Sequence, residues 1–158
     1  MNANYVNAII RATKGILTNH LGAGVTLHVP NQGTGSVSSN DISVILGVKG
    51  NLIGQIICSF NKDTAKNIVG TMMGGMTIET LDEMGWSAVQ EFGNWIAGTT
   101  ATELSTEGCI IDVTPPVTNE GLSTFHSSEK YISLLLESTI GMVHIHMSFQ
   151  EVEAKIRS

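Results

Sequence analysis

The chain has 158 residues and a mass of 16.8 kDa, and its 8 basic and 14 acidic side chains give a formal charge of −6. The 63 residues between Lys66 and Lys130 hold nine of the acids and no Lys or Arg, which argues against nucleic acid as a partner of this stretch. The length favours one domain, residues 1–158. Without a signal-peptide pattern or an apolar run long enough to span a bilayer, we expect a cytoplasmic protein that does not insert into a membrane.

The first half of the chain has helix and hairpin signals. Apolar side chains recur at the helical period over residues 6–21, which predicts an amphipathic helix that ends near Gly22. A strand at 25–29, a loop at 30–36 and two β-branched strands at 42–48 and 52–60, joined by a turn at 49–51, are expected to follow. Asn61 or Asp63 can then cap a helix that ends at Met73, before Gly74-Gly75.

The second half of the chain repeats this order after an acidic connection. We expect a helix of about five turns at residues 84–104 and a short strand at 109–113, before Pro115-Pro116. A three-stranded meander at 122–125, 131–137 and 142–149 and a terminal helix at 150–157 are expected to follow. The last turn of this terminal helix would carry Lys155 and Arg157, whose positive charges suit the negative end of a helix.

A local repeat supports the shared order. Residues 56–61, with Ala65-Lys66, match residues 145–150, with Ala154-Lys155, at a constant offset of 89. We therefore expect pseudo-duplicated halves, roughly 4–75 and 80–158. Strands that arrive as hairpins favour a mostly antiparallel sheet with two long helices packed on one face, so the predicted fold class is α+β.

The helix expected at residues 84–104 has two different faces. At 100° per residue, one side is a buried stripe that includes Val89, Phe92 and Ile96, whereas Glu91 and Asn94 lie on the opposite side. The flanking residues are small: Ser87, Gly98 and Ala101. Such neighbours would let another macromolecule approach the helix, although an ordinary solvated helix face is the plain alternative.

The pattern Ser87-x-x-x-Glu91-x-x-Asn94 resembles the signature of the CheX and CheC family of chemotaxis phosphatases. In that family a Pro follows some twenty residues later, and Pro115 or Pro116 fills this place. The layout of the whole chain is similar too, and the resemblance implies a CheC-like fold. The chain has a single motif helix, which is similar to CheX, whereas CheC usually has two. At an offset of 80 residues, Arg11 and Lys14 of the first helix stand where Glu91 and Asn94 stand in the second, so the first helix carries no second motif.

The resemblance implies hydrolysis of the aspartyl phosphate on a CheY-type response regulator. Asn94 would position the attacking water and Glu91 would grip a lysine of the regulator, while Ser87, Gly98 and Ala101 would contact the partner. The chain would need no cofactor of its own, since the regulator would hold the Mg²⁺, and a homodimer is expected. The alternative is a non-catalytic module that binds response regulators, related to flagellar switch proteins.

Two other motifs are candidate ligand sites. His144-x-His146 has a spacing that some metal sites use, but no third ligand is evident, so a polar outer strand face is the preferred interpretation and no metal is predicted. Gly70-x-x-x-Gly74-Gly75 lacks the Lys and Ser/Thr of a phosphate-binding loop, which argues against a nucleotide.

The sulfur-containing residues suggest packing roles. Cys58 and Cys109 lack the spacing of a disulfide framework and are expected to be small buried thiols, with one bridge between them as the alternative. Met72, Met73 and Met76 are expected to pack the end of their helix into the core, with a partner-binding patch as the alternative.

Overall fold

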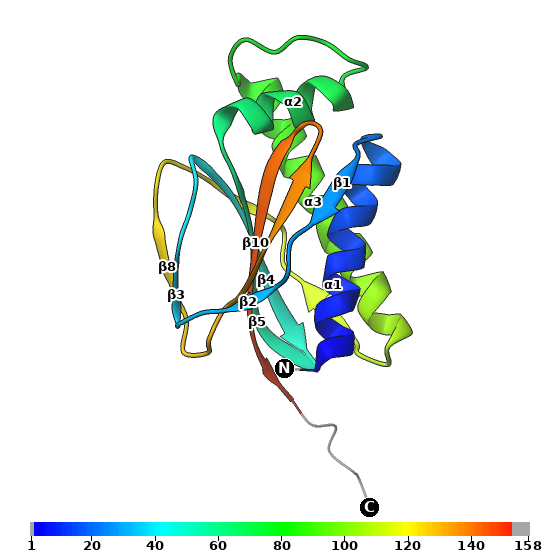
Figure 1. The fold of residues 1–158 in the computed structure, drawn as a ribbon, viewed down its shortest axis with the longest axis vertical. Coiled ribbons are helices and arrows are strands. Elements are labelled where there is room, and N and C mark those ends of the chain that lie inside the picture. The colour runs from blue at the N-terminus through cyan, green and yellow to red at the C-terminus, as the bar shows by residue number, and fades with distance from the viewer. Residues whose placement is uncertain (1, 153–158) are drawn as a thin grey trace, which may run out of the picture.

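A computed structural model describes residues 2–152 as a twisted, antiparallel sheet with helices over one face (Figure 1). The helices are α1 (Ala3–Gly15), which continues into a π-helical turn η1 (Ile16–His20), α2 (Lys62–Met72) and α3 (Glu83–Thr106). The strands are β1 (Val25–Leu27), β2 (Asn31–Gln32), β3 (Ser36–Ser38), β4 (Ile42–Gly50), β5 (Leu52–Phe60), β6 (Ile111–Val113), β7 (Val117–Glu120), β8 (Thr124–His126), β9 (Ile132–Ser138) and β10 (Gly141–Glu151). Within residues 2–152 no helix combines the length and apolarity that crossing a membrane requires.

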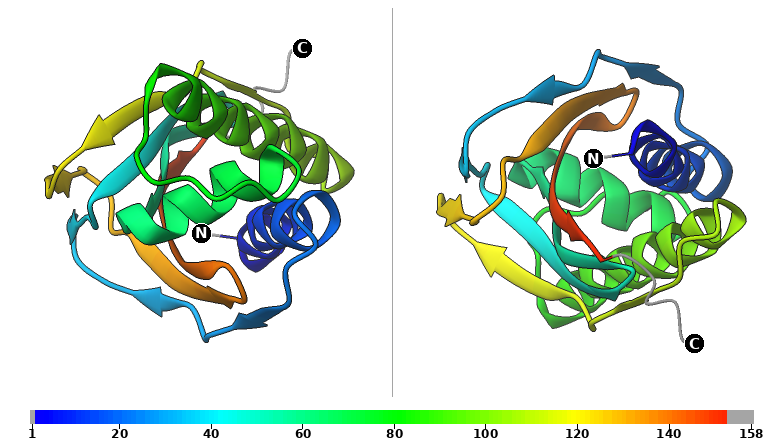
Figure 2. Two further views of the ribbon diagram at one scale, coloured as in Figure 1. Left: turned by 90° about the horizontal axis from the view of Figure 1, so that it is seen from above. Right: turned by 90° about the horizontal axis from the view of Figure 1, so that it is seen from below.

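The main sheet has the strand order β1-β9-β10-β5-β4-β6, with β2 also beside β9 and β7 also beside β4. All of these pairs are antiparallel, and the long strands β5 and β10 form its centre. Strands β3 and β8 pair only with each other, in a two-stranded ribbon on the side of the sheet away from α1 and α3 (Figure 2). Both faces of the central strands are therefore covered.

Local sequence signals account for where the elements begin and end. The Asn61 side chain accepts a hydrogen bond from the Thr64 amide at 2.8 Å and starts α2, and Asp82 does the same for α3 through the Gly85 amide at 2.9 Å. After α2, Gly74 and Gly75 have φ of +79° and +93°, a conformation that favours glycine and ends the helix.

The core lies between the sheet and the helices. Alternate residues of the strands, such as Val143 and Ile145 of β10, face Phe92 and Ile96 of α3 and Ile9 of α1. Helices α1 and α3 run antiparallel, since the Arg11 side chain contacts Glu103 whereas His20, at the end of η1, contacts Trp95. This packing fixes which face of α3 is left to solvent.

The structure confirms the predicted α+β class, with the two long helices α1 and α3 on one face. Three short strands, β2, β3 and β7, were not predicted, because runs of two to four residues carry little periodicity. The expected meander is wrong in its first strand, since β8 pairs with β3 rather than with β9. The terminal helix cannot begin at Gln150, because β10 continues to Glu151 along β5; residues 153–157 lie outside the described part.

The strand order supports the expected duplication, which stays a prediction. Each half contributes a long helix and a long hairpin, β4–β5 or β9–β10, and the two hairpins meet through β5 and β10. The outer strands correspond as well, since β1 and β2 flank β9 as β6 and β7 flank β4. The offset of 89 pairs Ile57 with its own counterpart His146, which places a pseudo-two-fold axis at the sheet centre.

Candidate functional site

The residues of the family signature lie on the solvent side of α3. Ser87, Glu91, Asn94 and Gly98 are exposed and Ala101 is half-buried. The opposite side is buried in the core through Val89, Phe92, Gly93, Ile96, Thr100 and Leu104. The predicted division of the helix into two faces is therefore correct, and it brings the carboxylate of Glu91 and the carboxamide of Asn94 together one helical turn apart.

The segment after α3 holds the helix in this rotation. A Cβ added to Gly93 would lie 2.8 Å from Val44 Cγ1 and 2.9 Å from Pro116 Cβ, so the absence of a side chain lets α3 approach the sheet and Pro116 closely. The Gln90 Nε2 donates a hydrogen bond to the Pro116 carbonyl oxygen at 3.1 Å. Pro116 is buried whereas Pro115 is exposed, so Pro116 is the one that packs beneath the signature.

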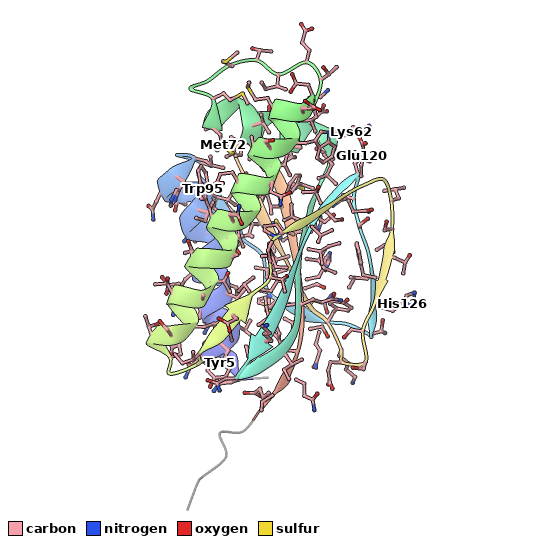
Figure 3. The ribbon with its side chains drawn as sticks, turned by 180° about the vertical axis from the view of Figure 1, so that it is seen from behind. Tyr5, Lys62, Met72, Trp95, Glu120 and His126 are labelled. Carbon is pink, nitrogen blue, oxygen red and sulfur yellow. The ribbon has the colours of Figure 1, made fainter. Side chains whose placement is uncertain are left out.

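Two basic side chains, Arg11 of α1 and Lys62 of α2, are engaged with acids other than Glu91. Arg11 reaches Glu103 and Glu107 at 3.1 and 3.2 Å. Lys62 reaches Glu120 at 3.5 Å, and Figure 3 labels both of these residues. Within residues 2–152, no ion pair or side-chain hydrogen bond engages Glu91 or Asn94. Both side chains of the pair are therefore available to a partner molecule.

An aromatic contact lies beside the pair, and the sequence reasoning did not single it out. Trp95, which is labelled in Figure 3 and follows Asn94 in the chain, is half-buried. It packs against His20 with ring centroids 5.0 Å apart. This contact joins α3 to the end of η1 and supports the middle of the helix from the side. It joins residues 75 positions apart in the chain, so no local pattern could indicate it.

The two histidines of β10 lie on the other face of the sheet, stacked with ring centroids 6.4 Å apart. The sequence predicted an outer strand face open to solvent, and this is wrong for His146, which is only 9% exposed. Its Nδ1 lies 2.7 Å from the Ser133 Oγ. Burial, and then the neighbouring His144, lower the pKa of His146 to about 4. Within the described residues no group of three or more His, Cys, Asp or Glu side chains is arranged to hold a metal ion.

The sulfur-containing side chains separate into buried and exposed groups. Cys58 and Cys109 are buried and free, and burial raises the pKa of both thiols. Met72 and Met73 pack against the core as expected. Met76 does not, since it is 61% exposed in the connection between α2 and α3.

Comparison with known proteins gives the class to which this fold and this helix belong. The model of the CheC-like family matches residues 84–120, the segment from α3 to β7 that carries the exposed pair and Pro116. The chain is also 34% identical over 121 residues to the CheY-P phosphatase CheX of Thermotoga maritima, covering 77% of this chain and 78% of that protein. The chain therefore belongs to the CheC-like family of chemotaxis proteins, as its sequence resemblance indicates.

Several of the structural relatives are CheX proteins. The crystal structure of CheX from Desulfovibrio desulfuricans matches with a TM-score of 0.82 at 21% identity, over 92% of this chain and 99% of that chain. CheX in a CheX–CheY–BeF₃–Mg²⁺ complex from Borrelia burgdorferi matches with a TM-score of 0.72 at 20% identity, over 93% of this chain and 98% of that chain. These likenesses establish the fold over nearly the whole chain.

Proposed function

We propose that this protein is a phosphatase that hydrolyses the aspartyl phosphate of a CheY-type response regulator. The observation that carries the proposal is the outward-facing Glu91 and Asn94, unengaged within residues 2–152, in a chain 34% identical to a CheY-P phosphatase. Because Glu91 and Asn94 already face outward from α3, the pair is placed to meet the active site of a partner.

Asn94 is proposed to position the attacking water. Catalysis of phosphoryl transfer depends mainly on alignment for in-line attack and on the stabilisation of charge. A carboxamide offers both a donor and an acceptor, so it can orient a water without adding negative charge beside the phosphoryl oxygens. A carboxylate at this position would repel them.

Glu91 is proposed to bind a lysine of the regulator through a charge-assisted hydrogen bond. The nearest basic residues in sequence are Lys66 and Lys130, 25 and 39 positions away. Since no described base pairs with Glu91 in space either, the pair with the regulator would not have to displace an internal one.

The small residues around the pair are proposed to admit the regulator. A Cβ built on Gly98 would meet nothing within 4 Å, so open space lies over this turn of α3. With Ser87 and Ala101 on the same face, the regulator's backbone could come close enough to bring its phosphate to Asn94. The Mg²⁺ of the reaction would belong to the regulator's own acidic pocket.

The protein is also proposed to act in the cytoplasm as a homodimer. The edge strands β1 and β6 of the main sheet each have one side without a strand partner among the described residues, and such edges can pair between copies. Sedimentation that finds only monomer at high protein concentration would contradict the dimer.

The phosphatase is tested by mixing the chain with phosphorylated response regulators and following phosphate release. We expect faster release with the unmutated chain and loss of that acceleration in Asn94→Ala and Glu91→Ala. Release by both variants at the unmutated rate would overturn the assignment. Saturable binding without any acceleration would instead favour the non-catalytic regulator-binding module.

A further inference from the structure

The connection between α2 and α3 forms a groove over the first turn of α3, at the top of the molecule in Figure 3. Its volume is about 360 Å³. Its apolar lining comes from Met73, Met76, Ile78 and Met84. The lining therefore combines these apolar side chains with polar and acidic ones, and flexible thioether side chains can adapt to a side chain inserted from outside.

Two of the methionines that line the groove are largely exposed. Met76 is 61% and Met84 is 67% exposed, although the core of the protein is well packed around Met73. Single exposed apolar residues are common, but apolar residues gathered in one concavity indicate a surface that a partner covers.

The charges at the groove are all of one sign. Glu79 and Asp82 belong to the lining of the groove, and no Lys or Arg does. Glu83, which follows Asp82 in the chain, is exposed. This arrangement complements an apolar side chain that carries Lys or Arg beside it.

The groove is continuous with the proposed regulator site. Met84, Ser87 and Glu91 are spaced by three and four residues, so they lie on one face of α3. At 1.5 Å per residue, Met84 is about 10 Å from Glu91 along the helix axis. A typical protein interface covers about 800 Å² on each partner, roughly 30 Å across, so a regulator centred on Glu91 would reach the groove.

The opposite end of the same face offers no comparable anchor. Beyond Asn94 the helix presents Gly98, Ala101 and Thr102 on this face. A stable complex needs an apolar anchor in its interface. Among the exposed positions of α3, Met84 is the one large apolar side chain that could provide it.

We propose that the response regulator inserts an apolar side chain, flanked by Lys or Arg, into the groove of Met76 and Met84, and that this contact selects the regulator. The proposal rests on the function proposed above. The groove would contribute affinity and specificity, whereas Glu91 and Asn94 would act at the phosphate.

The test compares initial rates of phosphate release over a range of phosphorylated regulator concentrations. For the double variant Met76→Ser/Met84→Ser we expect KM to rise about tenfold, the scale of one interface anchor, with kcat unchanged. Met84→Leu keeps an apolar side chain and should keep KM near the unmutated value. Ile110→Ser, which is a matched exposed apolar position 63% open to solvent beyond the far end of α3, should leave both constants unchanged.

The charge component is tested separately with Glu79→Lys. We expect KM to rise at low salt and the rise to shrink at high salt, since exposed charges are screened. Equal KM values for the groove variants and the unmutated chain would overturn the groove proposal while leaving the phosphatase in place. Loss of self-association with unchanged KM would assign the groove to a second copy and also overturn it. If no phosphorylated regulator is bound or dephosphorylated by the unmutated chain, both proposals fail.

Discussion

The ring of Pro116 packs against the backbone of Gly93, on the side of α3 that faces away from Glu91 and Asn94. A glycine in a helix interior costs stability in itself, but here it lets the segment after α3 lie directly beneath the signature. The exposed pair is thereby presented from a helix that is fixed from behind.

Two glycines of α3 should respond in opposite ways to the same substitution. Gly93→Ala would place its Cβ within 3 Å of Val44 and Pro116, and we expect the free energy of unfolding to fall by about 1–3 kcal/mol. A Cβ added at Gly98 would meet open space, so for Gly98→Ala the better helix propensity of Ala should raise the free energy of unfolding by up to about 1 kcal/mol. Urea unfolding of both variants measures the difference, and equal effects would contradict the close contact.

Shape-conserving changes separate the proposed roles of the exposed pair. Glu91→Gln keeps the size but loses the charge, so we expect KM to rise about tenfold and to become less sensitive to salt. Asn94→Asp adds a negative charge beside the phosphoryl group, so kcat should fall by about a hundredfold or more. Phosphate-release kinetics at two salt concentrations check both. If Glu91→Gln and Asn94→Asp both changed KM alone, or both changed kcat alone, the two residues would not have separate roles.

Thr100 offers a route to a more stable protein. Its side chain is fully buried on α3, and its Oγ1 has no hydrogen-bond partner among the described residues. Thr100→Val removes the unpaired hydroxyl at similar volume, so we expect the free energy of unfolding to rise by about 1 kcal/mol. The matched control is Thr13→Val, which loses the hydrogen bond from Thr13 to the Ile9 carbonyl and should be destabilising. Destabilisation of both variants in urea would contradict the prediction.

The buried histidine of β10 should make stability depend on pH. The pKa of His146 is lowered from 6.5 to about 4, so between these values the unfolded chain binds a proton that the folded protein does not. Stability should therefore fall as pH falls from about 6.5 to about 4. Comparing the unmutated chain with His146→Gln by urea unfolding at several pH values removes the common contribution of the carboxylates. Parallel pH curves for the two proteins would refute this role of His146.

The exposed pair could be predicted because it depends on one long helix. The periodicity over residues 84–104 determines which side of α3 is buried, and Glu91 and Asn94 fall on the other side. The same holds for the long hairpin β4–β5, whose β-branched runs and turn glycine, Gly50, are local signals. Helix caps were also readable, since Asn61 begins α2 as one of the two expected residues.

The contacts that join distant segments could not be predicted in this way. The pairing of β3 with β8, the choice of Pro116 over Pro115 and the tilted ring contact of Trp95 with His20 all depend on tertiary packing. The same is true of the burial of His146, because a polar residue on a strand is normally read as facing solvent. The methionines of the groove illustrate it too, since Met73 packs inward while Met76 does not.

The ion pairs of Arg11 with Glu103 and Glu107 have an effect well beyond the contacts themselves. They partly neutralise the acids near the C-terminal end of α3, while Glu79, Asp82 and Glu83 leave the other end negative. The balance of charge therefore differs between the two ends of α3. A basic partner approaching by diffusion would be turned toward the negative end before any side chains touch, so the order of events in association would be orientation first and contact second.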